Sequence, residues 1–298
     1  MKRDPNLDWQ HVEAKTLKLK GYQAIVIGGT GGIGRAISHL LAARGATVTV
    51  IGQTFRDQGM PGIAFIKADL SSMQDARRVA AELPVETLDL LLMTTGVMAG
   101  PERETTSEGI ENDMAISYLN RLVMLRQFGP RLGKARPANA AKPRVFIMGF
   151  PGAGGAGKLG DLNADRSYDG WSVHANTVAG NEILVLDAVD KYPNANFYGL
   201  NPGLVETNIR AKALQKLSPM TVLLSLAARL MAIKPEMLAE RITPLLVSPD
   251  LENHSGAMFN NKAEAILPSQ KLVDAPYRAR FLAESDALLA RQAGITLP

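Results

Sequence analysis

The stretch Ala24-Ile25-Val26-Ile27-Gly28-Gly29-Thr30-Gly31-Gly32-Ile33-Gly34 decides the fold of this chain. Its four apolar residues predict a buried strand, and residues 34–43 predict a helix that is stopped by Gly45. Glycines between a strand and a helix allow a tight turn and let a pyrophosphate approach the free N–H groups at the helix start. The stretch therefore predicts a dinucleotide-binding turn, against the alternative of a glycine-rich turn without a ligand. Two spacings fit and both stay open: Gly29-x-Gly31-x-x-Gly34 and Gly28-x-x-x-Gly32-x-Gly34.

The rest of the chain alternates short apolar runs with longer helical patterns. Strands are predicted at residues 47–51, 63–66, 88–93, 145–148 and 196–200, with a weak candidate at 257–259. Helical patterns cover residues 107–132 and 173–192. Strands that alternate with helices form a parallel sheet covered on both faces. We therefore expect an α/β fold, a single-domain Rossmann-type doubly wound parallel sheet, with its ligand at the carboxyl ends of the strands.

Composition limits the possible functions. The chain has 298 residues, no cysteine, and 33 Lys+Arg against 29 Asp+Glu, which gives a net charge of +4. Without cysteine there is no disulfide framework, thiolate nucleophile or Cys-ligated metal. The basic residues are scattered, so we expect no nucleic-acid partner. The histidines are too far apart for a metal site: His11, His39, His174 and His254.

Targeting and domain signals are few. Residues 1–20 are polar and charged, unlike a secretory signal. The longest apolar stretch, 220–233, contains Arg229 and is shorter than the about 20 residues that span a bilayer. We expect a cytoplasmic protein without stable membrane insertion. Its expected parts are an N-terminal extension at 1–20, one dinucleotide-binding domain at 21–262, and a C-terminal helical tail at 263–298.

The end of the second predicted strand bears on the choice of cofactor. NAD sites often place an acid there to hold the ribose 2′-hydroxyl, whereas an arginine suits the 2′-phosphate of NADP. Here the sequence reads Gln53-Thr54-Phe55-Arg56, and no acid appears before Asp57. We expect NADP or NAD, with NADP preferred, and the alternative for Arg56 is a solvated loop charge.

Several segments together resemble the short-chain dehydrogenase/reductase family over residues 21–262. The glycine spacing Gly28, Gly32, Gly34 matches that family, and Asp69-Leu70 resembles its adenine-ring contact. Met93-Thr94-Thr95-Gly96 stands where the family has Asn-Asn-Ala-Gly, and residues 201–207 match its Pro-Gly segment beside the nicotinamide. The resemblance implies a dinucleotide groove with these cofactor contacts: Gly28, Thr30, Gly32, Ile33, Gly34, Gln53, Arg56, Asp69, Leu70, Thr95, Gly96, Val97, Pro202, Gly203, Val205 and Thr207.

The catalytic positions of the family are occupied by other residues here. The family uses a Ser after the fifth strand, a Tyr-x-x-x-Lys on the next helix and a supporting Asn. On that frame Phe150 replaces the Ser, Val173 the Tyr, Thr177 the Lys, and Ser117 the Asn. A positioned acid or base contributes about 10²–10⁴-fold in rate. The family's carbonyl reduction should therefore be slow unless another group supplies the proton.

Three residues are candidates for that group, each with a structural alternative. His174 has a suitable titration range, but lies about 100° around the helix from position 173 and should point away from the cofactor, in a packing or surface role. Tyr168 precedes the helix and could turn into the site, or be a loop or interface aromatic. Ser117 keeps a hydroxyl near the pocket, or is an ordinary helix-interior serine.

We expect an NAD(P)(H)-binding oxidoreductase with a non-standard active site. Its substrate is expected to be a small to medium, largely apolar carbonyl, alcohol or imine, because the apolar insert at about 208–235 stands where the resemblance to the family implies a substrate lid. Packing against a partner subunit and shallow membrane contact are the alternatives for that insert. Two other functions stay open: a non-redox isomerase or cyclase, and a non-catalytic dinucleotide-sensing or assembly protein. The family resemblance also implies a homodimer or homotetramer built from the two long helices.

Overall fold

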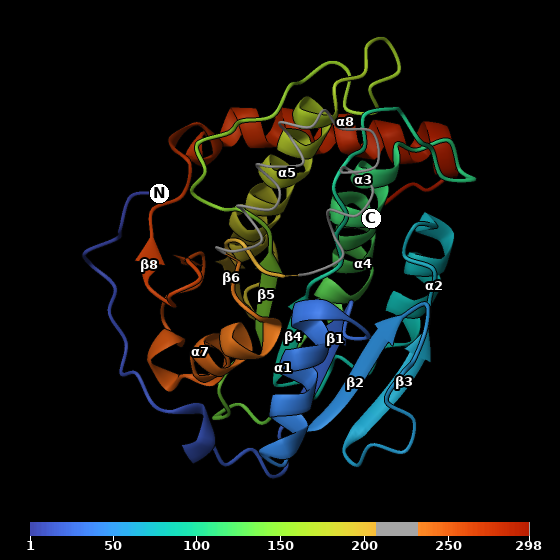
Figure 1. The fold of residues 1–298 in the computed structure, drawn as a ribbon. Coiled ribbons are helices and arrows are strands. Elements are labelled where there is room, and N and C mark those ends of the chain that lie inside the picture. The colour runs from blue at the N-terminus through green and yellow to red at the C-terminus, as the bar shows by residue number, and fades with distance from the viewer. Residues whose placement is uncertain (207–231, 298) are drawn as a thin grey trace.

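One mixed sheet forms the centre of the molecule. The computed structural model describes residues 1–206 and 232–297, and its sheet has the order β3-β2-β1-β4-β5-β6-β7-β8 (Figure 1). Neighbouring strands are parallel except β7 and β8. This confirms the expected single-domain doubly wound α/β fold. The strands are β1 Gln23–Ile27, β2 Thr47–Gly52, β3 Ile63–Lys67, β4 Leu90–Met93, β5 Arg144–Met148, β6 Asn196–Leu200, β7 Met258–Phe259 and β8 Ala265–Ile266.

Helices cover both faces of the sheet, and the strands alternate between them. In β1, Ile25 and Ile27 pack into the cluster under α2, α4, α5 and α8, whereas Ala24 and Val26 pack into the cluster under α1 and α7. Successive strand side chains point to opposite faces, so a strand buried on both sides is apolar throughout. The helices are α1 Gly32–Ala43, α2 Met73–Glu82, α3 Asn112–Met114, α4 Asn120–Phe128, α5 Gly170–Lys191, α7 Pro235–Val247 and α8 Ala275–Ala293.

The prediction of one helical region over 107–132 was wrong at its start and in its continuity. Residues 107–111 form a turn, in which Gly109 has φ +77° and Thr105 bridges to Glu111. The helix starts at Asn112, where the Glu111 carboxylate accepts a hydrogen bond from the Met114 N–H at 2.8 Å. A π-helical segment, Ala115–Leu119, then separates α3 from α4. Helix α5 also begins earlier than predicted, at Gly170, and α1 begins at Gly32.

The two terminal segments pack on the domain. Leu7, Trp9 and Leu19 are buried in the cluster under α1 and α7. Strand β8 lies after residue 262 and extends the sheet into the predicted tail. The division of the chain at residues 20 and 262 stays a prediction.

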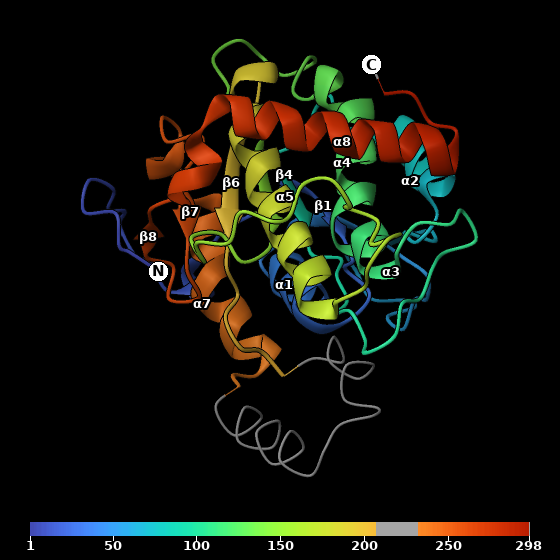
Figure 2. The same cartoon turned by 90° about the horizontal axis from the view of Figure 1, so that it is seen from above.

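Helix α8 crosses the outer side of α4 and α5 (Figure 2). The Tyr118 ring lies 5.8 Å from the Phe281 ring, and its hydroxyl lies 3.0 Å from Ser285 Oγ. The surface through which a homodimer or homotetramer was expected is therefore covered by the chain's own helix. The assembly itself stays a prediction, and it would need another surface.

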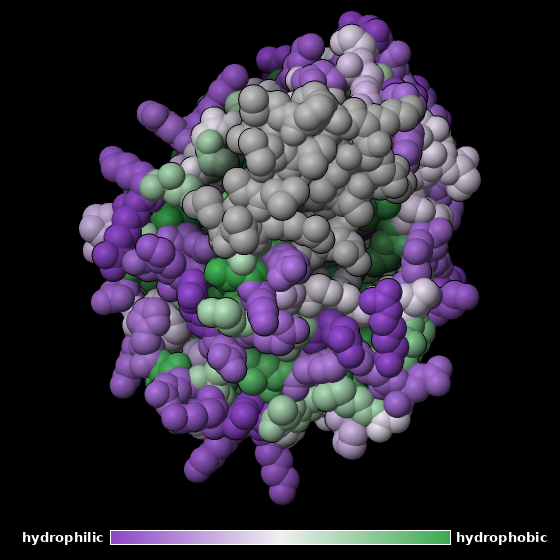
Figure 3. Space-filling view, in the orientation of Figure 1, coloured by the Kyte–Doolittle hydropathy of each residue, from purple (hydrophilic) through white to green (hydrophobic). Residues whose placement is uncertain are grey.

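The face of the molecule seen in Figure 1 is mostly hydrophilic. Figure 3 shows apolar side chains on it only in separate areas among hydrophilic ones. Over residues 1–206 and 232–297, no helix has both the length and the apolar character needed to cross a bilayer. The apolar insert predicted at about 208–235 falls mainly on residues 207–231, outside the described part of the chain.

Candidate active site

The glycine-rich turn joins β1 to α1 at the carboxyl end of the sheet. Gly28 and Gly32 have positive φ, +86° and +48°. A Cβ on Gly28 would lie 2.7 Å from Thr94 Oγ1, and one on Gly34 would lie 2.5 Å from the Gly28 carbonyl oxygen. A Cβ on Gly31 would meet nothing within 4 Å. The geometry thus favours glycine at Gly28, Gly32 and Gly34. Of the other spacing, Gly29 is also closely packed, with a Cβ 2.8 Å from Val50 Cγ1, whereas Gly31 has free space.

The turn forms a cradle that fits a dinucleotide. Helix α1 has Gly31 as its N-cap without a side-chain hydrogen bond, and no acidic residue lies in its first turn. Its first N–H groups and the positive end of its dipole are therefore available to a pyrophosphate. Thr30 packs against Gly52 at the end of β2, where a Cβ would lie 2.6 Å from Thr30 Oγ1. Because the glycines of this turn carry no side chain, their backbone can approach a ligand closely.

The end of β2 carries one exposed arginine and one neutralised acid. Arg56 is exposed and forms no ion pair with a described residue. The Asp57 carboxylate accepts hydrogen bonds from Arg35, the shortest 2.6 Å, and lies 3.1 Å from His39 Nε2. The Arg35 hydrogen bond lowers the pKa of Asp57 to about 2. The adjacent Gln53 donates to Asp69 Oδ1 at 2.8 Å.

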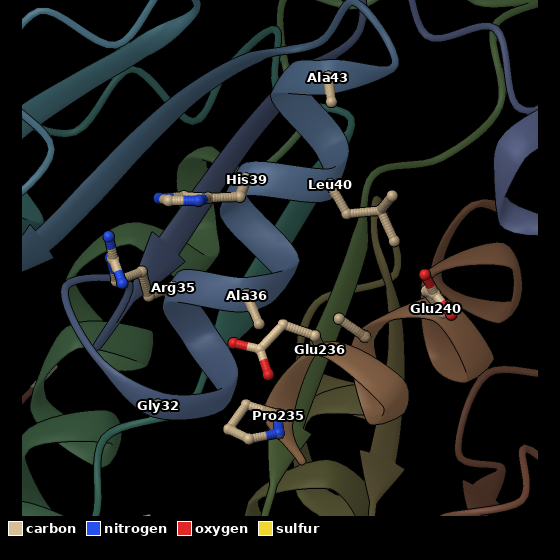
Figure 4. A pocket seen from close by; sticks show the side chains of 10 residues that line it. Gly32, Arg35, Ala36, His39, Leu40, Ala43, Pro235, Glu236 and Glu240 are labelled. Carbon is tan, nitrogen blue, oxygen red and sulfur yellow. The ribbon is translucent and has the colours of Figure 1, made fainter.

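A hollow of about 370 Å³ lies between α1 and α7 and starts at Gly32. Figure 4 shows Arg35 and His39 projecting from α1 on the side away from Glu236 and Glu240 of α7. Arg35 and His39 both contact Asp57. The hollow is separate from the carboxyl ends of β4 and β5.

After β4, every second residue of the segment 95–99 forms a hydrogen bond with every fourth residue of the α3–α4 region, from Asp113 to Arg121. Ala99 N–H donates to Asp113 Oδ2 at 3.1 Å, Val97 N–H donates to Ser117 Oγ at 3.0 Å, and the Thr95 carbonyl accepts from Arg121. Two extended residues rise about 6.6 Å and four helical residues about 6 Å, so the two repeats match. We call this arrangement the polar ladder: Thr95, Val97, Ala99, Asp113, Ser117 and Arg121.

Helix α5 completes the polar ladder from the other side. His174 Nδ1 lies 2.8 Å from Asp113 Oδ2. Asn181 Nδ2 donates to the Ser117 carbonyl at 2.8 Å, within the π-helical segment, and Asn181 Oδ1 accepts from Arg121 at 2.8 Å. π-Helical segments occur often at functional sites. The ladder therefore joins the segment after β4, the α3–α4 region and α5 at one place.

Arg121 is a buried cation without an acidic partner. Only 2% of its surface is exposed, and within the described residues it forms no ion pair. Burial lowers the pKa of Arg121 to about 9. Its Nε and the neighbouring Thr95 Oγ1 are both buried and lack a hydrogen bond within residues 1–206 and 232–297. Such atoms are rarely left unpaired, so a bound group or water at Thr95 would satisfy them.

The residues predicted from the sequence to stand in place of the family's catalytic residues are Phe150, Val173 and Thr177. Val173 and Thr177 are buried in α5, with 2% and 1% exposed, and Phe150 is half-buried after β5. Tyr168 donates its hydroxyl proton to the Gly100 carbonyl at 2.7 Å, and burial raises the pKa of Tyr168 to about 12. Tyr168 therefore holds the segment after β4 in place and is a weak acid.

The Pro-Gly segment lies at the carboxyl end of β6. Gly203 has φ +67°, and a Cβ there would lie 2.6 Å from Asn261 Nδ2. Its N–H donates to Asn201 Oδ1 at 3.0 Å, and Val205 bridges to Ile233. Thr207, the last predicted cofactor contact, lies outside the described residues.

Asp113, Arg121 and Asn181 were not among the predicted site residues. A signal for two of them exists in the sequence, since polar residues recur at 113, 117 and 121 within an apolar helical region. Their partners are distant in sequence, so the pattern alone does not give the pairs. No group of three or more His, Asp or Glu side chains in the described residues is placed to hold a metal.

Comparison with known proteins identifies the family. Residues 22–139 match the family model described as short chain dehydrogenase. The chain is 42% identical to the Saccharomyces cerevisiae protein named "Uncharacterized oxidoreductase YKL107W", over 97% of this chain and 95% of that protein. The chain therefore belongs to the short-chain dehydrogenase family, whose members are oxidoreductases.

More distant relatives share the fold. The chain is 26% identical to the mouse (Mus musculus) polyprenol dehydrogenase, over 82% of this chain and 77% of that protein. A protein from Mycobacterium paratuberculosis superposes with a TM-score of 0.70 at 19% identity, over 97% of this chain and 100% of that one. A 3-oxoacyl (acyl-carrier-protein) reductase from Agrobacterium tumefaciens C58 with NADP bound has a TM-score of 0.58 at 20% identity, over 83% and 95%.

Proposed function

We propose that this protein is an NADP(H)- or NAD(H)-dependent oxidoreductase that acts on a small to medium, largely apolar carbonyl, alcohol or imine without the family's Ser-Tyr-Lys group. The observation that carries the proposal is the glycine cradle, in which Gly28 and Gly34 leave no room for a Cβ. When bound there, the nicotinamide supplies or accepts a hydride. The residues of this chain bind the dinucleotide, orient the substrate and exclude water.

Two charges support NADP(H) over NAD(H). Arg56 is exposed beside the end of β2 and is available for a 2′-phosphate. Asp57, the acid nearest to that strand, is already bound by Arg35 and so is a poor partner for a ribose hydroxyl. The Agrobacterium reductase of the same fold, which was solved with NADP, agrees with this choice.

The apolar substrate class has separate support. The insert predicted to act as a lid is apolar in sequence. The mouse relative is, by its name, a dehydrogenase of a polyprenol, which is an apolar alcohol. A hydride acceptor that already carries a positive charge, such as an iminium, would need the least help from an acid at this site.

Calorimetry with NADP⁺ and NAD⁺ tests the cofactor. We expect NADP⁺ to bind more tightly, and Arg56→Ala to weaken NADP⁺ about tenfold, which is the loss of one charge-assisted contact, while NAD⁺ changes little. Arg166→Ala, an exposed arginine in the loop before α5, is the matched control. Failure of both dinucleotides to bind at millimolar concentration would contradict the function as a whole. If Arg56→Ala weakened the binding of NADP⁺ and NAD⁺ equally, only the preference for NADP would be contradicted.

A further inference from the structure

We propose that His174, held by Asp113, is the proton donor and acceptor of this active site in place of the missing tyrosine. This inference rests on the proposed function. Between Gly170 and Asn181 of α5, His174 is the only residue with an acidic or basic side chain. An acid–base group on the first three turns of this helix must therefore be His174.

The position of His174 follows from the spacing of α5. Gly170, His174, Thr177 and Asn181 recur at intervals of four and three, so they share one helix face. This face lies against the polar ladder, because a Cβ on Gly170 would lie 2.7 Å from the Gly100 carbonyl and Asn181 bonds the Ser117 carbonyl. Val173 points into the core on the adjacent face. His174 thus stands beside the segment after β4, at the carboxyl end of the sheet.

Asp113 orients the His174 ring. The Asp113 side chain is fully buried, and its Oδ2 contacts both His174 Nδ1 and the Ala99 N–H. A carboxylate can only accept hydrogen bonds, so Nδ1 carries a proton and donates a hydrogen bond to Asp113. This leaves Nε2 as the atom that gains or loses a proton. About one-fifth of the His174 side chain is exposed, and Nε2 has no hydrogen bond to a described residue, so a ligand can reach it.

The other titratable groups nearby are less suited to the role. Tyr168 gives its proton to the Gly100 carbonyl. Glu111 caps α3 and is 1% exposed. Arg121 donates to carbonyls of the ladder and is 2% exposed. Compared with these three described side chains, His174 is the one that combines a fixed orientation with an accessible nitrogen.

A hydride from the reduced nicotinamide adds to the carbonyl carbon, the π electron pair moves to the oxygen, and the imidazolium Nε2 gives its proton to that oxygen, which yields the alcohol. The neutral ring then takes a proton from water. Asp113 stabilises the charged ring before transfer and keeps the same tautomer throughout. In the reverse direction Nε2 accepts the hydroxyl proton.

Kinetics of NADPH oxidation with an aliphatic aldehyde, an aromatic ketone and a cyclic imine test this role. We expect His174→Gln to lower kcat about 10²–10⁴-fold for the carbonyls, with the dissociation constant of NADP⁺ changed less than about threefold. The imine should lose less, since its protonated iminium form already carries the proton that a carbonyl oxygen must receive from the protein. Asp113→Asn should also lower kcat, because the amide oxygen can accept from Ala99 N–H and His174 Nδ1 at the place of Asp113 Oδ2 but carries no negative charge to stabilise the imidazolium. His254→Gln is the matched control, since His254 lies before β7, near the amino end of β6.

A second measurement needs no substrate. The chain has four histidines, so their ring resonances can be resolved and that of His174 assigned from the His174→Gln spectrum. Saturation with NADP⁺ should shift the His174 resonance and leave His254 in place. An unmoved His174 resonance in the NADP⁺ complex, or carbonyl turnover that survives His174→Gln, overturns the inference while the oxidoreductase stands. Absence of dinucleotide binding by the wild-type chain would instead contradict the proposed function.

Discussion

At the scale of single residues, the turn after β1 separates glycines that the fold needs from one that it does not. Gly34 packs against the Gly28 carbonyl and Thr94, whereas Gly31 faces open space. Gly31 is the N-cap of α1, and Gly34 lies in the first turn of that helix. Gly34 belongs to both glycine spacings of the sequence, whereas Gly31 belongs to one, so the free space at Gly31 favours the spacing Gly28, Gly32, Gly34.

We expect Gly34→Ala to lower the free energy of unfolding by at least about 2 kcal/mol, because its Cβ forces backbone apart. Gly31→Ala should cost less than about 1 kcal/mol, the usual effect at an N-cap, and should retain NADP⁺ binding. Urea unfolding and calorimetry check both variants. Equal destabilisation by the two substitutions would refute this assignment of the turn.

At the scale of elements, the start of α3 depends on a buried carboxylate. Glu111 accepts from the Met114 N–H, and its own N–H donates to Asn163 Oδ1 at 2.8 Å. Burial raises the pKa of Glu111 from 4.5 to about 7. The unfolded chain therefore releases this proton at lower pH than the folded chain, so the contribution of Glu111 to stability is greatest below pH 4.5 and falls as the pH rises toward 7.

We expect Glu111→Gln to remove this pH dependence while it keeps the hydrogen bond to Met114. At about 1.4 kcal/mol per pKa unit, the wild-type chain should lose roughly 3 kcal/mol relative to the variant between pH 4.5 and pH 7. Unfolding free energies measured at several pH values test this. Parallel pH profiles for the two chains would show that Glu111 does not titrate in this range.

The elements also show how far the sequence could be read. The strands were predicted because buried parallel strands are continuous apolar runs, as in 24–27 and 145–148. Helices α2 and α7 were missed, since two of the four buried residues of α2 are alanine and α7 contains Pro244. The glycine turn was found because its residues are consecutive. The pair Asp113–His174 was not found, because its members are 61 residues apart and meet only through the packing of α3 on α5.

At the scale of the whole molecule, α8 acts as a cover for α4 and α5. Phe281 is fully buried against Tyr118, and Ser285 lies beside the same ring. Tyr277 donates to the Ala156 carbonyl at 2.6 Å, which joins α8 to the loop after β5. The helix therefore links the outer face of the domain to a loop that leads from the site.

We expect Phe281→Ala to lower the free energy of unfolding by about 3–5 kcal/mol, the usual cost of emptying a buried aromatic position. Arg280→Ala, the exposed neighbour on the same helix, should change it by less than about 0.5 kcal/mol. Urea unfolding measures both, and light scattering reports the mass of each variant. If the two variants had similar unfolding free energies, the packing of α8 on the domain would contribute little to stability.

The position of α8 in the chain has a consequence for synthesis. Ala275, which begins α8, follows Phe128, which ends α4, by 147 residues. At about 5–20 residues per second, a ribosome needs roughly 7–30 s to cover that distance. Throughout this interval the nascent chain carries α4 without its cover, and the ring of Tyr118 is open to chaperones or to neighbouring nascent chains. During synthesis the chain therefore exposes an apolar surface that α8 buries in the complete fold.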